Sequence, residues 1–151
     1  MILTNATAAK KAVIAALQAQ TDPGELLDGV AVDYAFNGNA GPVSVYGGGW
    51  RLDQEDAVAE TPGVLVREVV SVSLYVRVVA RPPVDVSVTD DQADAVAGAF
   101  GAIFKATPKL AGPLTVLGVA SGQGDYSRTD DETISVHAYQ VRVGSYLSWG
   151  A

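Results

Sequence analysis

The sequence predicts an α+β fold in which two helices pack against one mixed or antiparallel sheet. Three observations predict this class. Apolar and polar residues alternate over residues 64–81, which is the period of a half-buried strand. Apolar residues recur at spacings of three and four in two other segments, as in amphipathic helices. The chain has 151 residues, 48% of them hydrophobic and 18% charged, so we expect one globular domain over residues 1–151.

The N-terminal part is expected to hold one helix and two short strands. Thr4 or Asn5 can cap a helix that runs to about Gln20, where a turn containing proline and glycine follows. Residues 30–36 and 43–46 alternate in polarity and are therefore predicted to be strands. The glycine-rich turn between the two segments favours a hairpin.

Residues 47–63 are expected to form a long flexible loop. Three glycines at 47–49 lead into Trp50 and a series of acidic residues, and Thr61-Pro62-Gly63 closes the segment. We expect the glycines to act as a hinge. Loops of this length in compact domains are usually functional or disordered.

The segment Val64–Arg81 carries the strongest signal in the chain. Eight of the nine even-numbered residues from Val64 to Ala80 are apolar, which predicts a strand with one buried face. Such a strand is roughly 55 Å long, whereas a domain of this size is about 40 Å across. The strand must therefore bend sharply or project, and a projecting strand exposes an edge that invites partners.

The second half is expected to hold one helix and two closing strands. Thr89-Asp90-Asp91-Gln92 has the pattern of a capping box, and an apolar helical face continues to about Ala106. Residues 114–120 are predicted to be a short strand, followed by a polar connection. Residues 133–146 are predicted to be the last strand, with a bulge near Ala138–Tyr139 where the apolar phase shifts.

Composition excludes several classes of protein. The chain has no cysteine, so disulfides and thiolate metal sites are excluded. No apolar run is long enough to span a membrane, and residues 1–9 lack the pattern of a secretory signal. The net charge is −7 and the ten basic residues are scattered, which argues against tight binding of nucleic acid.

No group of residues predicts catalysis, a cofactor or a metal. His137 is the only histidine, and no neighbouring sequence supplies a partner, so we expect it at a surface or interface. The glycines at 47–49 lack the Lys-Ser/Thr of a phosphate loop. Residues 125–131 alternate like a calcium loop, but Asp130 replaces the required glycine and Val136 the required glutamate. We therefore expect a non-enzymatic protein.

The order of the predicted elements resembles the tail terminator proteins of long-tailed, siphovirus-type bacteriophages. The match extends over residues 6–147 and is closest in the long strand 64–81, the helix 89–106 and the closing hairpin 125–143. The resemblance implies an α+β subunit without catalysis or cofactor that forms a hexameric ring on the last ring of tail-tube protein. It also implies neck or head-completion proteins as partners, and genomic DNA passing through the ring without tight binding. The subunit would be made in the host cytoplasm and incorporated at the tail–neck junction of the virion.

Two sets of residues are candidates for this role. Tyrosine, tryptophan and arginine are enriched at the centres of interfaces. We therefore expect the outer face of the long strand and one tryptophan to contact a neighbouring subunit or the tube. These residues are Arg67, Ser71, Ser73, Tyr75, Arg77 and Trp50. A hole for DNA should repel phosphate, which makes two acidic groups candidates for its wall: Asp53, Glu55, Asp56, Asp125, Asp130 and Asp131. The alternative interpretation of these acids is that they keep the outer surface soluble.

Other classes of protein remain alternatives. Stopper and head-completion proteins of the phage neck have a similar size. A small ligand-binding or enzymatic α+β domain would require convergent polar groups in a pocket. A toxin, immunity or regulatory protein would be expected as a monomer or dimer.

Overall fold

The computed structural model describes residues 4–60 and 63–149, and the side chains of all of these except 54–60, 63–65, 121 and 147–149. The described residues form two helices and five strands, which confirms the predicted α+β class. In chain order these are α1 (Ala6–Gln18), β1 (Ala31–Asp33), β2 (Val43–Glu60), β3 (Gly63–Ala80), α2 (Val86–Ala106), β4 (Thr115–Arg128) and β5 (Thr133–Trp149).

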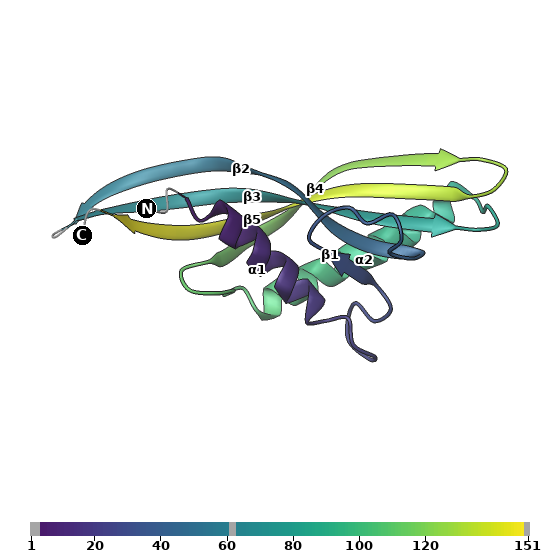
Figure 1. Ribbon diagram of the computed structural model, residues 1–151, viewed down its shortest axis with the longest axis horizontal. Helices are drawn as coiled ribbons and strands as arrows, with labels where there is room; N and C mark the ends of the chain where they lie inside the picture. Colours follow the sequence, from purple (N-terminus) through teal and green to yellow (C-terminus); the bar gives the residue numbers. More distant parts are fainter. Residues whose placement is uncertain (1–3, 61–62, 150–151) are drawn as a thin grey trace.

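The five strands form one mixed sheet in the order β1-β2-β3-β5-β4. Strand β1 pairs parallel with β2, and the other neighbouring strands are antiparallel. Both helices lie on the same side of this sheet, with α1 against β1, β2 and β3, and α2 against β3, β5 and β4 (Figure 1). On the opposite side of the sheet the described residues form no helix, and we call this side the open face.

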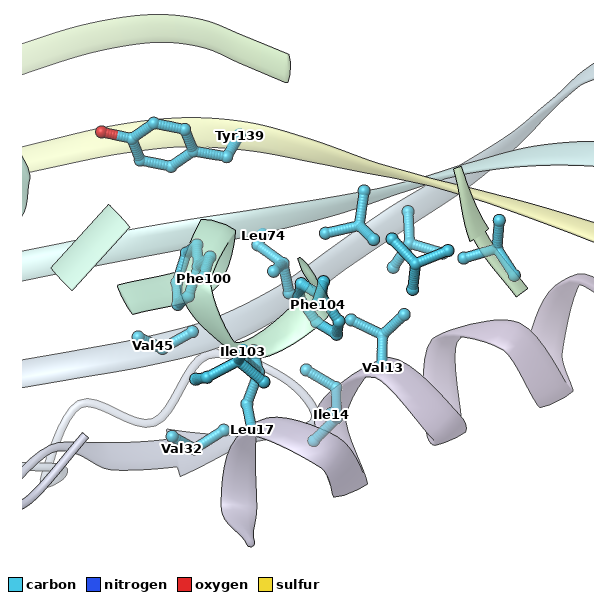
Figure 2. Packing of buried hydrophobic residues seen from close by; sticks show 14 of the residues in the cluster. Val13, Ile14, Leu17, Val32, Val45, Leu74, Phe100, Ile103, Phe104 and Tyr139 are labelled. Atoms are coloured by element: carbon cyan, nitrogen blue, oxygen red, sulfur yellow. The ribbon is translucent and has the colours of Figure 1, made fainter. Parts of the chain in front are cut away.

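The hydrophobic core lies between the sheet and the two helices. The even-numbered residues of β3 predicted to be buried do lie in this core, from Val70 to Val78. Figure 2 shows Phe100 of α2 near Leu74 and Val45 of the sheet, and Leu17 of α1 next to Ile103 of α2. Burial of each such side chain stabilises the fold by about 1.5–3 kcal/mol, so this layer holds the helices on the sheet.

The long strand crosses the whole molecule. β2 and β3 have 18 residues each, which corresponds to roughly 60 Å of extended chain. Figure 1 shows both strands running from one end of the molecule to the other, with a pronounced twist near the middle of the sheet. The long strand fits into the molecule because the sheet is elongated and twisted.

The described residues of the predicted loop at 47–63 form strands, and residues 61–62 lie outside the described residues. Residues 47–60 belong to β2 and pair with β3 as far as Glu60 opposite Gly63. Two register shifts, between Gly47 and Trp50 and between Leu52 and Gln54, break the alternation that identifies a strand in a sequence. Two of the three glycines permit close contacts, because a Cβ on Gly47 would lie 2.6 Å from the carbonyl oxygen of Tyr34, and one on Gly48 would lie 2.5 Å from the ring of Tyr75.

The predicted hairpin between residues 30–36 and 43–46 was also wrong. The two strands pair in parallel, with Ala31 opposite Ser44 and Asp33 opposite Tyr46. The connection between them turns at Asn37–Ala40, and the carbonyl of Pro42 accepts a hydrogen bond of 2.7 Å from the amide of Val79. This bond holds the start of β2 next to the end of β3. Strand β2 runs antiparallel to β3 and parallel to β1.

Helix α2 begins earlier than the capping box predicts. Asp85 caps it and accepts a hydrogen bond of 2.9 Å from the amide of Ser87. Thr89 lies inside the helix and is fully buried, so it cannot act as the cap. The predicted end of the helix at Ala106 is correct.

Strand β4 is longer than predicted, because it continues through the polar segment to Arg128. The bulge expected in β5 lies in β4 instead, where the register shifts between Ser121 and Gln123 opposite Ala138–Tyr139. β5 itself pairs with β3 without interruption. Its apolar phase changes because polar residues near its start face α2, as described below.

Candidate functional site

The open face presents most of the residues predicted to form contacts. Directly opposed residues of neighbouring strands share a face, and the register places Arg67, Ser73, Tyr75 and Arg77 on the face opposite the core. Ser71 lies on the same face but is buried. Their role as an interface stays a prediction.

Trp50 does not join this group. It pairs with Val72, a core residue, so it lies on the side of the sheet that carries the helices. The next residue, Arg51, pairs with Ser71 and lies on the open face. Trp50 is 43% exposed, so it remains accessible, but on a different side of the molecule.

An aromatic cluster gives one half of the open face a fixed shape. The rings of Tyr46 and Tyr75 are stacked with centroids 5.2 Å apart, and Phe36 meets Tyr46 edge-on at the same distance. The guanidinium of Arg77 lies 5.7 Å from the centre of the Phe36 ring, within reach of a cation–π attraction. Burial raises the pKa of Tyr46, so its hydroxyl remains neutral near pH 7.

A polar cluster occupies the middle of the open face. The carboxylate of Asp53 accepts hydrogen bonds from the hydroxyl of Ser71 and from Nε of Arg51, the latter at 2.7 Å, and Arg142 lies 4.0 Å away. The bond from Ser71 and then that from Arg51 hold the pKa of Asp53 below its usual value. Asp53 is therefore an ionised group fixed on the sheet and does not belong to a movable loop.

The structure does not bring the two predicted groups of acids together. Asp53 of β2 lies opposite the middle of β3. Three other acids, Asp125, Asp130 and Asp131, are exposed around the β4–β5 turn, next to the end of β3. The backbone of Glu55 and Asp56 lies in β2, and their side chains are outside the described residues.

His137 has partners that the sequence analysis missed. Its side chain is 13% exposed and lies between β5 and α2, with Nε2 2.9 Å from a carboxylate oxygen of Asp90. Nδ1 lies 3.3 Å from the hydroxyl of Tyr139 and 3.4 Å from Asp94. The expectation that His137 has no partners and lies at the surface was wrong, and the alternative of an interface position stays a prediction. A signal existed, since Asp90 and Asp94 are four residues apart and so project from one side of a helix.

This polar network joins α2 to β5. The Asp90 oxygen that meets His137 also accepts a hydrogen bond of 2.8 Å from Ser135, and the hydroxyls of Ser135 and Thr89 lie 2.7 Å apart. The bond from Ser135, followed by that from His137, lowers the pKa of Asp90. The hydroxyl of Ser135 is thus bonded to both Asp90 and Thr89.

The described part of the chain contains no group of three or more histidine or acidic side chains arranged to hold a metal ion. None of its helices is long and apolar enough to cross a membrane.

Comparisons with known proteins give a similarity to a solved structure. No family model matches the chain, and no curated protein matches it. Among solved structures, the fold is similar to a chain in the virion of a native gene transfer agent (GTA) particle, with a TM-score of 0.46 and 16% identity over 90% of this chain and 94% of that chain. A likeness of this degree does not establish a shared function.

Proposed function

We propose that the chain is a non-enzymatic assembly subunit of a phage virion and acts as a tail terminator. In this role, copies form a hexameric ring that caps the tail tube, ends its polymerisation and joins the tail to the neck. The open face of each subunit provides contacts to its neighbours or to the tube. DNA passes through the centre of the ring, and no cofactor takes part.

The uncovered face of the long sheet carries this proposal. The face combines arginines with aromatic rings, the residue types that are enriched at interfaces and depleted at other surfaces. Phe36 is 59% exposed at the edge of the aromatic cluster, and a hollow of about 460 Å³ between Tyr75, Val136 and Ala138 continues it. Contiguous apolar surface of this kind usually marks a contact site.

The order of secondary structure gives separate support. The described elements retain the long strand, the following helix and the closing strands on which the resemblance to tail terminators rests. The fixed aromatic stack adds to this, because a preformed surface loses little conformational entropy on binding.

The hole in the ring is part of the same proposal. Asp125, Asp130 and Asp131 are exposed at one end of the sheet, where a ring can direct them toward its axis. Asp53 is less suited, because Ser71 and Arg51 hold it on the open face.

A double substitution tests the open face. Tyr75→Ala with Arg77→Ala should leave the monomer folded, since neither side chain belongs to the core cluster, but should prevent ring formation and joining to tails. The matched control is Val88→Ala with Lys105→Ala, which removes an exposed apolar and a basic residue from α2. Circular dichroism checks folding, and native mass spectrometry and electron microscopy report assembly. Normal rings and tails from the Tyr75/Arg77 variant would contradict the proposal.

A different neck protein, such as a stopper or head-completion protein, is the nearest alternative. Such a protein would also use the open face for assembly. It would not determine the length of the tail, which is the property that separates the two roles.

A further inference from the structure

The turn between α1 and β1 forms a preordered acidic knob. Leu27 is buried and its amide donates a hydrogen bond of 2.9 Å to the carbonyl of Gln20. The carboxylate of Asp28 accepts a bond of 3.1 Å from the amide of Gly24, which adopts φ +87°. Leu26 points outward and is 56% exposed. The turn is therefore held in place while its one large apolar side chain remains accessible.

The knob carries only negative charge. Asp22, Glu25 and Asp28 surround Leu26 and are exposed, and no basic residue occurs from Ala19 to Val30. Figure 1 shows the connection from α1 to β1 projecting away from the sheet on the side that carries the helices. A rigid apolar residue with an acidic rim suits a hollow that is apolar at its base and basic at its margin.

The end of β3 contains a hollow of that kind. It has a volume of about 630 Å³ and lies between the glycine-rich turn before β2 and the start of the connection to α2. Val79, Pro42 and Val84 contribute apolar surface, and Arg77 and Arg81 are the charged residues of its lining. No acidic residue lines it.

The two arginines retain capacity for an additional anion. Arg81 meets one carboxylate oxygen of Glu132 through Nε and one terminal nitrogen, at 2.7 and 2.6 Å, which leaves other N–H donors of its guanidinium. Among the described residues, Arg77 has no acidic side chain within ion-pair distance and meets the ring of Phe36 instead.

We propose that the acidic knob of one copy of this chain docks into the Arg77–Arg81 hollow of the next copy. Leu26 enters the apolar base, while Asp22 and Glu25 meet the arginines. The knob lies on the helix-bearing side and Arg77 on the open face, so the contact joins different surfaces of two copies. Such a heterologous contact repeats from copy to copy and closes into a ring when the rotation permits. The inference rests on the proposed function, since it names the contact that builds the ring.

Charge reversal provides a direct test. Variant one carries Arg77→Glu with Arg81→Glu, and variant two carries Asp22→Arg with Glu25→Arg. Each alone opposes like charges at every contact, so self-association should weaken by roughly tenfold or more. In an equimolar mixture, the acidic knob of variant one meets the basic hollow of variant two, and the reversed knob of variant two meets the reversed hollow of variant one. Mixed rings of alternating subunits should therefore form.

Sedimentation velocity on the purified full chain measures this, with thermal unfolding as the folding check. Asp91→Arg is the control, because it reverses an exposed acid on α2 that belongs neither to the knob nor to the lining of the hollow, and it should assemble normally. Leu26→Ala should weaken association without altering charge. Wild-type-like assembly by both reversed variants, or a mixture that remains as dissociated as its components, would overturn the docking inference. If the docking inference fails but the wild-type chain still forms rings on tails, the proposed function is retained. A wild-type chain that stays monomeric would overturn both the docking inference and the proposed function.

Discussion

The hydroxyl of Ser71 on β3 donates a hydrogen bond to the carboxylate of Asp53 on β2, at the centre of the open face. The pair joins the two longest antiparallel strands at a point where β2 is irregular, next to the register shift between Leu52 and Gln54. The sequence analysis placed Asp53 in a flexible segment, whereas this bond holds Asp53 on the sheet.

Acid stability should depend on this carboxylate. The pKa of Asp53 is lowered in the folded chain, mainly by Ser71, so its ionised form stabilises the fold above its unfolded pKa of about 3.9. That contribution is lost as the pH falls through the lower, folded value. Asp53→Asn should therefore reduce stability at pH 7 and flatten its decline on acidification below about pH 4. Urea unfolding of both proteins across this range measures the difference, and parallel pH profiles would contradict the assignment.

The three consecutive glycines should differ in their tolerance of a methyl group. A Cβ on Gly48 would lie 2.5 Å from a ring carbon of Tyr75, whereas a Cβ on Gly49 has no neighbour within 4 Å. Gly48→Ala should displace the Tyr46–Tyr75 stack, cost about 1–3 kcal/mol of stability and weaken assembly. Gly49→Ala should be close to neutral. Thermal unfolding and ring formation of the two variants provide the comparison, and equal behaviour would show that the ring of Tyr75 yields without consequence.

The core layer predicts a large effect at α2. Phe100 is fully buried and meets Tyr139 edge-on at 6.0 Å between ring centroids. Phe100→Ala should lower the free energy of unfolding by about 3–5 kcal/mol. Val88→Ala, on an exposed position of the same helix, should change it by less than about 0.5 kcal/mol. Urea denaturation separates the two, and a small loss for Phe100→Ala would contradict the assigned packing of α2.

Charge at the β4–β5 turn should affect the movement of DNA. If Asp125, Asp130 and Asp131 line the hole, changing all three to Asn should slow ejection or the completion of packaging, and changing them to Lys should slow it further. Added positive charge increases contacts with phosphate. Tail length should stay normal in both variants. Time courses of genome ejection at several salt concentrations measure the effect, and unchanged ejection by the Lys variant would remove these acids from the wall of the hole.

The regular parts of the fold were predictable because their sequence period is undisturbed. The even-numbered residues of β3 are apolar except for Glu68, and α2 keeps Ala93, Phe100, Ile103 and Phe104 on one buried face. The second half of β2 was not predictable in this way, because two register shifts interrupt the pairing of β2 with β3. The polar end of β4 is rich in glycine, serine and aspartate, which strands generally disfavour, yet pairing with β5 holds it extended.

The candidate surface was predictable only in part, for a related reason. Alternation along a single strand is enough to place Arg67, Ser73, Tyr75 and Arg77 on one face. The partners of His137 lie in a helix more than 40 residues away in sequence, since Asp90 is separated from it by 47 positions. The side of the sheet on which Trp50 lies depends on the bulge before it. Contacts that depend on tertiary packing or on a bulge leave no periodic signal in the sequence.

Tail length tests the central claim most directly. Electron micrographs of tails assembled with and without this subunit measure whether it ends polymerisation of the tail tube. Our account predicts tails of one length with a ring at the end when the subunit is present, and overlong tails of variable length when it is absent. Tails of the same uniform length in both preparations would contradict the assignment of this chain as a tail terminator.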